Sequence, residues 1–196
     1  MGKQNIEIRW LTPELCEDWV RFFDDIAFKD HEDWAFCYCL EGHFDRKTQE
    51  EWTSPTERRE KAIELIQNGE MQGYLAYEDN KVIGWCNVND RENYRYLMTM
   101  FEEIGYQTEQ DNNLKIKSIF CFLIDPQHRG RGVAHKLLDK VCEDALKEGY
   151  TYIETYPFAD GGFEFQYHGT HKMYERNNFT EVEDFEFIKV MRKALR

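Results

Sequence analysis

The chain has 196 residues, of which 41% are hydrophobic and 15% aromatic, a composition that indicates a globular rather than a disordered protein. Its formal net charge of −13 argues against nucleic acids and anionic membranes as partners, and it permits a cationic acceptor such as an amine. No apolar stretch reaches transmembrane length, and the N-terminus lacks the apolar segment of a signal peptide. The six cysteines are scattered, as is typical of reduced thiols, so we expect a cytoplasmic protein. The length of the chain predicts one domain over residues 1–196.

The first half of the chain predicts a strand, two helices and a hairpin. Apolar residues alternate with polar ones over residues 6–10, which favours a strand. Residues 12–26 begin with Thr-Pro, an N-cap followed by a proline at the first helical position, and then carry one apolar face. A Ser-Pro-Thr-Glu capping box begins a second helix over residues 54–69. Residues 73–88 contain two apolar runs around a polar turn, which is typical of a β-hairpin.

Six elements are expected in the second half. Apolar residues recur at helical spacing over residues 94–104, and β-branched and aromatic residues fill a strand at residues 114–124. A helix begins after Gly132 and ends at Gly149, because a glycine commonly follows the last helical residue. The remaining elements are a strand at residues 150–156, a short helix that contains Tyr174, and a hairpin over roughly residues 179–191.

The junction between the strand that ends at Ile124 and the helix that follows Gly132 carries the main functional signal. An Asp-Pro step ends the strand, because proline cannot donate to a sheet ladder. The order strand, glycine turn, helix brings free backbone N–H groups and a helix N-terminus to one point, which favours an anion. Arg129 and Arg131 add positive charge there. The sequence therefore predicts a phosphate-binding loop.

Three kinds of phosphate-binding loop compete for this segment. A Rossmann fingerprint needs a third glycine at the position that His135 occupies, and a P-loop pattern is absent. The segment does resemble the acetyl-coenzyme A loop of the GNAT superfamily of N-acetyltransferases. The pattern of that loop is [Q/R]-x-x-G-x-[G/A], and Arg129, Gly132 and Ala134 fill its three fixed positions.

A second stretch resembles the same superfamily. Its members usually carry a Tyr-Glu-Lys-x-Gly-Phe run near the C-terminus, and residues 174–179 read Tyr-Glu-Arg-Asn-Asn-Phe. Asn178 replaces the usual glycine, and asparagine also tolerates the left-handed conformation of a helix C-cap. Tyr167 stands where many relatives have an asparagine that touches the cofactor, so this chain departs from the family pattern there.

The resemblance implies an α/β (α+β) fold with a mixed, mostly antiparallel central sheet flanked by helices. It also implies acetyl-CoA as the cofactor, held by the strand edge and by backbone N–H groups of the loop. The stretches 29–52, 91–113 and 158–168 are then elaborations of the core, where substrate choice usually resides. The cofactor-binding residues are expected to be Phe122, Leu123, Ile124, Arg129, Gly130, Arg131, Gly132, Val133 and Ala134.

Transfer of an acetyl group to an amine needs two proton transfers. In the family a tyrosine at the position of Tyr174 often protonates the leaving thiolate, so we expect Tyr174 to be the general acid. For the proton of the acceptor amine we rank Glu154 first, with His168 and His171 as alternatives. The strand edge offers a backbone N–H to the developing oxyanion.

We therefore expect an acetyl-CoA-dependent N-acetyltransferase that acts on a small amine or an aminoacyl group as a monomer or homodimer. A non-catalytic acyl-CoA sensor on the same fold is one alternative. An O- or S-acyltransferase, or an enzyme for longer acyl chains, is another.

A metal site is a further alternative that the sequence raises. His31, Cys37, Cys39 and His43 offer two imidazoles and two thiols within a short segment. The Cys-x-Cys gap is shorter than the usual zinc-chelating spacing, so we expect no metal and expect the thiols to line the acceptor pocket or to pack.

Overall fold

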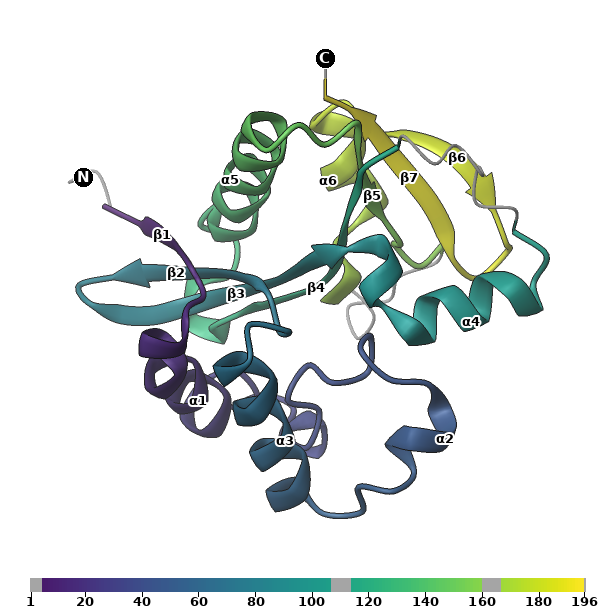
Figure 1. The fold of residues 1–196 in the computed structure, drawn as a ribbon. Coiled ribbons are helices and arrows are strands. Elements are labelled where there is room, and N and C mark those ends of the chain that lie inside the picture. Colours follow the sequence, from purple (N-terminus) through teal and green to yellow (C-terminus); the bar gives the residue numbers. More distant parts are fainter. Residues whose placement is uncertain (1–4, 107–113, 160–166, 196) are drawn as a thin grey trace.

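A seven-stranded sheet forms the centre of the computed structural model, which describes residues 5–106, 114–159 and 167–195 (Figure 1). The strand order is β1-β2-β3-β4-β5-β7-β6, and β4 and β5 are the one parallel pair in it. This confirms the predicted mostly antiparallel sheet. The strands are β1 (Glu7–Trp10), β2 (Gly73–Glu78), β3 (Lys81–Asp90), β4 (Ile116–Ile124), β5 (Tyr152–Thr155), β6 (Thr180–Asp184) and β7 (Lys189–Ala194).

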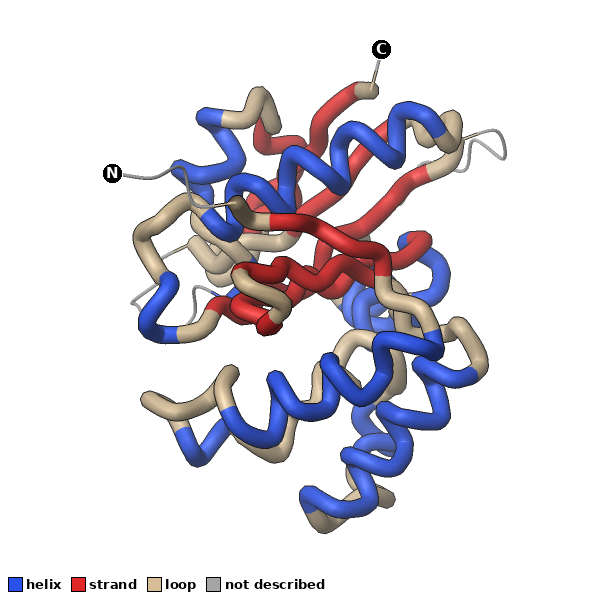
Figure 2. Tube along the Cα trace, turned by 90° about the vertical axis from the view of Figure 1, so that its left-hand side faces the viewer, coloured by secondary structure: helices blue, strands red, loops and turns tan. Residues whose placement is uncertain are grey.

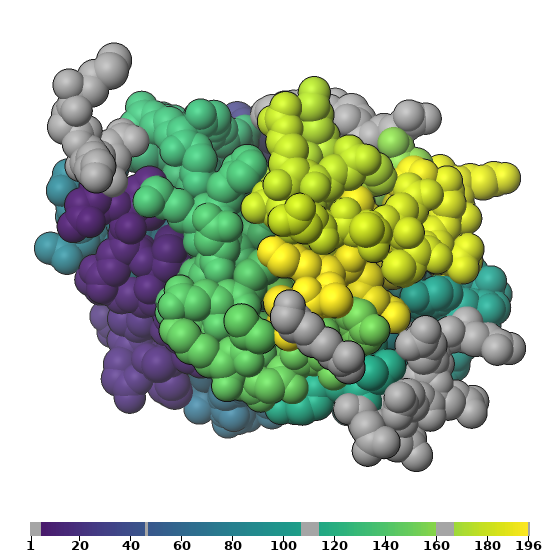
Figure 3. Space-filling model, turned by 90° about the horizontal axis from the view of Figure 1, so that it is seen from above, coloured from purple at the N-terminus to yellow at the C-terminus, as the bar shows by residue number. Residues whose placement is uncertain are grey.

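Helices cover both faces of the sheet, so that it is the middle layer of three (Figure 2). On one face lies α5, which in the view from above separates the N-terminal elements from the C-terminal ones (Figure 3). The opposite face carries α1, α3 and α4. The helices are α1 (Cys16–Asp25), α2 (Arg46–Gln49), α3 (Pro55–Gln67), α4 (Arg95–Glu103), α5 (Val133–Lys147) and α6 (His171–Arg176), with short 3₁₀ turns at residues 13–15, 32–34, 91–93 and 126–128.

The helix ends show which local signals decided the structure. The capping box is present: the Ser54 hydroxyl accepts a hydrogen bond from the Glu57 amide at 3.2 Å, and the Glu57 carboxylate accepts one from the Ser54 amide at 3.0 Å. Gly149 follows α5 with φ of 76°, the left-handed conformation expected there. The expected helix cap at Thr12 is wrong, because a 3₁₀ turn follows it, its side chain makes no capping hydrogen bond, and α1 begins only at Cys16.

β5 pairs with only the first part of β4, and the remainder of β4, which β5 does not pair with, positions the site. Residues 116–119 of β4 pair with residues 152–155 of β5, whereas β3 pairs with β4 as far as Ile124. The amide of Asp125 donates to the carbonyl of Ile83 at 3.0 Å. The hydrogen-bonding direction alternates along an antiparallel pair. The backbone N–H and C=O groups of Phe122 and Ile124 therefore point away from β3, toward the edge of β4 that β5 does not pair with.

Candidate active site

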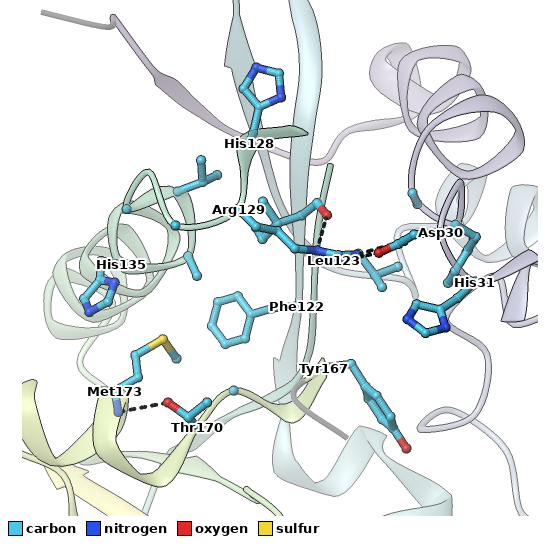
Figure 4. Close-up of a pocket in the computed structure, with 18 of the residues that line it drawn as sticks. Asp30, His31, Phe122, Leu123, His128, Arg129, His135, Tyr167, Thr170 and Met173 are labelled. Atoms are coloured by element: carbon cyan, nitrogen blue, oxygen red, sulfur yellow. Dashed lines mark hydrogen bonds and ion pairs between the residues drawn. The ribbon is translucent and has the colours of Figure 1, made fainter. Parts of the chain in front are cut away.

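A pocket of about 510 Å³ lies along residues 122–124 of β4, beyond the part that pairs with β5 (Figure 4). The loop that begins α5 forms one wall, and the segment after α1 forms another. The segment that leads into α6 completes the lining. Phe122 packs in the core on the α5 side of the sheet and Leu123 in the core on the α1 side, so the pocket reaches both faces at this edge. Of the nine expected cofactor-binding residues, eight line the pocket, namely Phe122, Leu123, Ile124, Arg129, Gly130, Gly132, Val133 and Ala134, while Arg131 is exposed and does not line it.

The loop before α5 has the features that a phosphate group needs. Gly130 and Gly132 have φ of 74° and 80°, and a Cβ on either glycine would meet no atom within 4 Å. Both conformations are left-handed and suit glycine, and the space beside both is open. Gly132 is the N-cap of α5 and has no side chain that could cap the helix, so the first N–H groups of α5 lack a side-chain partner at its positive end. The residues present therefore fit an anionic group such as a pyrophosphate.

The base of this loop is anchored to the sheet through His128. Its Nδ1 lies 2.7 Å from a carboxylate oxygen of Asp125, and its Nε2 lies 3.1 Å from one of Glu78 at the end of β2. The carboxylate of Asp125 also accepts a hydrogen bond from the amide of Gln127 at 3.0 Å. These contacts fix the 3₁₀ turn that leads from β4 into the glycines.

Arg129 connects the loop to the opposite wall of the pocket. Its Nε donates to the carbonyl of Ile124 at 3.3 Å, and its guanidinium forms an ion pair with Asp30, with Nη2 at 3.2 Å from Oδ1 (Figure 4). Partial burial of Asp30 opposes its ionisation, but the hydrogen bond and charge of Arg129 prevail and lower the pKa of this carboxyl below its usual value. Asp30 is therefore ionised at neutral pH.

Tyr174 lies behind the pocket wall. Its side chain is fully buried, and its hydroxyl donates to the carbonyl of His168 at 2.7 Å. Gly169 lines the pocket, and a Cβ on it would stand 2.5 Å from this hydroxyl. Gly169 alone therefore separates the Tyr174 hydroxyl from the pocket. Burial raises the pKa of Tyr174 well above its ordinary value. General-acid catalysis by Tyr174 stays a prediction, and it requires the hydroxyl to leave the His168 carbonyl.

Glu154 lies in a buried charge network and does not line the pocket. Its side chain is fully buried, and its Oε2 accepts hydrogen bonds from Arg192 at 2.9 and 2.6 Å. Tyr156 donates to Oε1 at 3.0 Å, and Nη1 of Arg91 lies 3.6 Å from Oε2. A removed partner would leave a buried charge unpaired, so the arrangement gives Glu154 a structural role. Proton transfer by Glu154 stays a prediction that would require this network to open.

The two alternatives for the base also lie outside the reacting region. His168 lines no part of the pocket, and its Nδ1 donates to the carbonyl of Phe120 at 2.5 Å. Burial lowers its pKa to about 4, so the ring is neutral. His171 lies on the surface of α6 and contacts the carboxylates of Glu175 on the same helix and of Glu181 in β6.

The cysteines of the segment after α1 do not line the pocket either. Cys39 is buried in the core, where its sulfur accepts a hydrogen bond from Trp85 Nε1 at 3.2 Å. Cys37 packs against the same core, and burial raises the pKa of its thiol. The expectation that the thiols line an acceptor pocket is thus not met at this pocket, and they pack instead. Within the described ranges, no group of three or more His, Cys, Asp or Glu side chains is placed to hold a metal ion.

Sequence reasoning missed the wall opposite the loop. Asp30, His31 and Trp34 line it together with Tyr167. The His31 ring stacks on Trp34 at a centroid distance of 4.3 Å, and Trp34 meets Tyr167 edge-to-face at 5.9 Å. The segment after α1 has no periodicity and no motif, so its place at the pocket follows only from tertiary packing. Two signals were available: residues 29–52 are among the expected elaborations of the core, and Tyr167 stands at a position where relatives contact the cofactor.

The sequence model of the "Acetyltransferase (GNAT) family" matches residues 14–179, and the chain belongs to this family. No curated protein matches the chain significantly.

Solved structures share the fold at low sequence identity. The PaiA N-acetyltransferase of Thermoplasma acidophilum in complex with coenzyme A has a TM-score of 0.57 and 17% identity, over 97% of this chain and 99% of that one. A polyamine N-acetyltransferase of Drosophila melanogaster has a TM-score of 0.60 and 10% identity, over 97% and 100%. An aminoglycoside N-acetyltransferase in complex with CoA has a TM-score of 0.54 and 17% identity, over 95% of each chain. Within the part of the chain that the structure describes, no helix has the length and apolar character needed to traverse a bilayer.

Proposed function

We propose that this protein is a cytoplasmic acetyl-CoA-dependent N-acetyltransferase with one catalytic domain over residues 1–196. The observation that carries the proposal is the open loop at Gly130 and Gly132, which leads from the unpaired edge of β4 to the uncapped N-terminus of α5. Anion-binding N–H groups and a strand edge that can pair with amides thus lie on one pocket. Coenzyme A carries both of these chemical groups, a pyrophosphate and an amide-containing arm.

The chain's own groups divide the work of binding. The N–H groups at the start of α5 bind the pyrophosphate, and the helix dipole adds to this attraction. The backbone of Phe122 and Ile124 faces away from β3. The carbonyl of Ile124 accepts a hydrogen bond from Nε of Arg129, and the other backbone groups of this edge can pair with the pantetheine amides. When bound, the thioester supplies the acetyl group. A backbone N–H of the same edge then stabilises the oxyanion that develops during the attack.

The acceptor amine must reach the pocket from the α1 side. Leu123, His31 and Tyr167 line this side, and the loop before α5 lies opposite (Figure 4). Glu154, His168 and His171, the groups that the sequence offered as a base, do not line the pocket. His31, which the sequence raised only as a possible metal ligand, does line it, so we assign the amine proton to His31, directly or through water. Tyr174 remains the proposed donor to the leaving thiolate from behind Gly169.

The acceptor class is a small amine or aminoacyl group. The structural neighbours named as N-acetyltransferases of polyamines and aminoglycosides support an amine, and the net charge of −13 favours a cationic one. O-acyl transfer and longer acyl chains are competing outcomes of the same assay.

A non-catalytic acyl-CoA sensor is the second candidate. It is favoured by one observation, that neither Tyr174 nor Glu154 lines the pocket. Two measurements separate the candidates: binding of coenzyme A by thermal shift, and release of free thiol from acetyl-CoA over a panel of amines. Binding with turnover supports the enzyme, binding without turnover on any amine supports the sensor, and no binding contradicts both.

A further inference from the structure

The Arg129–Asp30 ion pair bridges the two walls of the pocket. Arg129 is the residue before the open glycines, and Asp30 lies in the segment after α1, 99 residues away in the sequence. Both side chains remain about one-third exposed, at 32% and 34%, and both residues line the pocket. The pair therefore stands where a ligand of the pocket can reach it.

A pyrophosphate bound at the loop would compete with Asp30 for the guanidinium. Arg129 directly precedes Gly130, and two phosphates present more negative charge and more acceptor oxygens than one carboxylate. A partly exposed ion pair adds little to stability, so its exchange for a pyrophosphate costs little free energy. Nε of Arg129 can keep its bond to the Ile124 carbonyl while the outer nitrogens turn toward the loop.

Exchange would leave an ionised carboxylate on the acceptor side. Asp30 would face the pocket next to the stacked rings of His31 and Trp34, with Tyr167 at the same wall. A carboxylate bordered by aromatic faces suits a cationic group on an organic body, because ring faces attract cations and apolar stems alike.

We propose that coenzyme A draws Arg129 away from Asp30, and that the released carboxylate binds a second, non-reacting cationic group of the acceptor. The acceptor class is then a diamine or another amine with an additional positive charge. This inference rests on the proposed function, because it requires coenzyme A at the loop.

The cation at Asp30 is a second group rather than the reacting amine. The nucleophile must lose its proton, and a carboxylate in contact would hold it in the ammonium form. A distal cation instead anchors the acceptor and leaves the amine at the other end free to reach the thioester.

The test compares two amines of equal length, 1,5-diaminopentane and 1-aminopentane, by calorimetric titration with and without free coenzyme A. Free coenzyme A carries no acetyl group, so binding is measured at equilibrium without turnover. For the wild-type protein we expect coenzyme A to raise the affinity for the diamine about fivefold or more and to leave that for the monoamine nearly unchanged. By reciprocity the diamine must raise the affinity for coenzyme A by the same factor.

Asp30→Asn separates this role from a merely structural one. We expect the variant to bind coenzyme A alone up to about fivefold more tightly, since no ion pair must break, and to lose the preference for the diamine. The control is Asp24→Asn, near the C-terminal end of α1. Asp24 pairs with Arg59 at 3.0 Å and is similarly exposed, at 31%, but lies outside the pocket, so this variant should bind all three compounds like the wild type.

Three results would overturn the inference. Weaker binding of coenzyme A by Asp30→Asn would show that the ion pair supports the loop instead of competing with it. A diamine preference that persists in Asp30→Asn would show that another group binds the second cation. A wild-type protein without a diamine preference would show that no group binds it. If the wild type binds no coenzyme A at all, the proposed function fails as well, and this arm is read first.

Discussion

The two halves of β4 contrast sharply, although they belong to one continuous strand. Over residues 116–119 the strand pairs on both sides, and buried ion pairs such as that of Glu154 with Arg192 lie beside it. Over residues 120–124 it pairs with β3 alone, and its free edge faces a pocket. The charged side chains beside the first half form a network within the protein. In the second half the carbonyls of Phe120 and Ile124 accept hydrogen bonds from His168 and Arg129, and the strand edge between them faces the pocket.

This contrast separates structural from functional polar residues. Glu154 is a titratable residue at the centre of the sheet, which made it an attractive base in the sequence, but its contacts are those of a buried ion pair. Gly130 and Gly132 carry no side-chain chemistry, yet they open the backbone at the point where an anion fits. Four predictions test the contrast, from the largest expected effect to the smallest.

Glu154→Gln should lower the free energy of unfolding by about 3–5 kcal/mol, because it removes the buried carboxylate that Arg192 and Arg91 share. Denaturant unfolding measures this loss. Glu64→Gln, which removes an exposed partner of Lys61, is the control and should cost less than about 1 kcal/mol. If Glu154→Gln unfolds like the wild type but has lost turnover, Glu154 is a catalytic base and the assignment to structure is wrong.

Gly132→Asp should weaken coenzyme A binding about 100-fold or more, because the side chain and its charge would occupy the space of the phosphate. Thermal shift with and without coenzyme A measures it. Gly149→Asp is the matched control at the other end of α5, with φ of 76° and open space beside it, and it should retain the ligand-induced shift. An unchanged shift in Gly132→Asp would move the cofactor to another site.

The glycine loop before α5 and α5 itself could be predicted from sequence because their determinants are local. The glycines, the Asp-Pro step and the apolar spacing of the helix lie within 30 residues, and the capping box at Ser54 likewise depends on four adjacent residues. Eight of the nine expected cofactor residues line the pocket for the same reason.

The rest of the site depends on contacts between distant residues. Asp30 meets Arg129 across 99 residues, and Arg192 meets Glu154 across 38. Neither pair leaves a periodic or motif-like trace, so a single sequence could not tell which carboxylate faces the pocket and which is buried. Two expected segments lie outside the described residues. They are residues 160–166 of the aromatic loop expected at residues 158–168, and the polar stretch at residues 107–113.

Acid should destabilise the protein through two buried histidines. Burial lowers the pKa of His43 and His168 to about 4, from an ordinary value of 6.5. Between these values the unfolded chain binds the proton and the folded chain does not, so this contribution is fully present above about pH 6.5 and is lost as the pH falls toward 4. Each ring should cost about 2 kcal/mol between pH 7 and pH 5.

His168→Asn isolates the histidine that holds the open half of β4. Its loss of stability between pH 7 and pH 5 should be smaller than that of the wild type by about 2 kcal/mol, measured by denaturant unfolding at both pH values. An identical loss in both proteins would mean that His168 titrates normally in the folded state.

Tyr174→Phe should lower kcat about tenfold on the best amine and leave the affinity for coenzyme A unchanged. This is less than the usual 10²–10⁴-fold contribution of a general acid, because the raised pKa of the buried hydroxyl makes it a weaker acid and water can substitute. Tyr94→Phe is the control. The buried hydroxyl of Tyr94 donates a hydrogen bond to Asn87 at 2.9 Å and does not line the pocket, so this variant should affect stability alone. Equal kcat for Tyr174→Phe and the wild type would leave Tyr174 only its bond to His168.

The most direct test of the account is to follow backbone amide NMR signals while coenzyme A is added. If the free edge of β4 and the N-terminus of α5 hold the cofactor, the largest shifts will occur at Phe122, Ile124 and residues 130–134. Residues 180–194 of β6 and β7 should shift little. Shifts concentrated in β6 and β7, or in the groove between α1 and α3 that Val20 and Ile63 line, with none at the loop, would contradict the account.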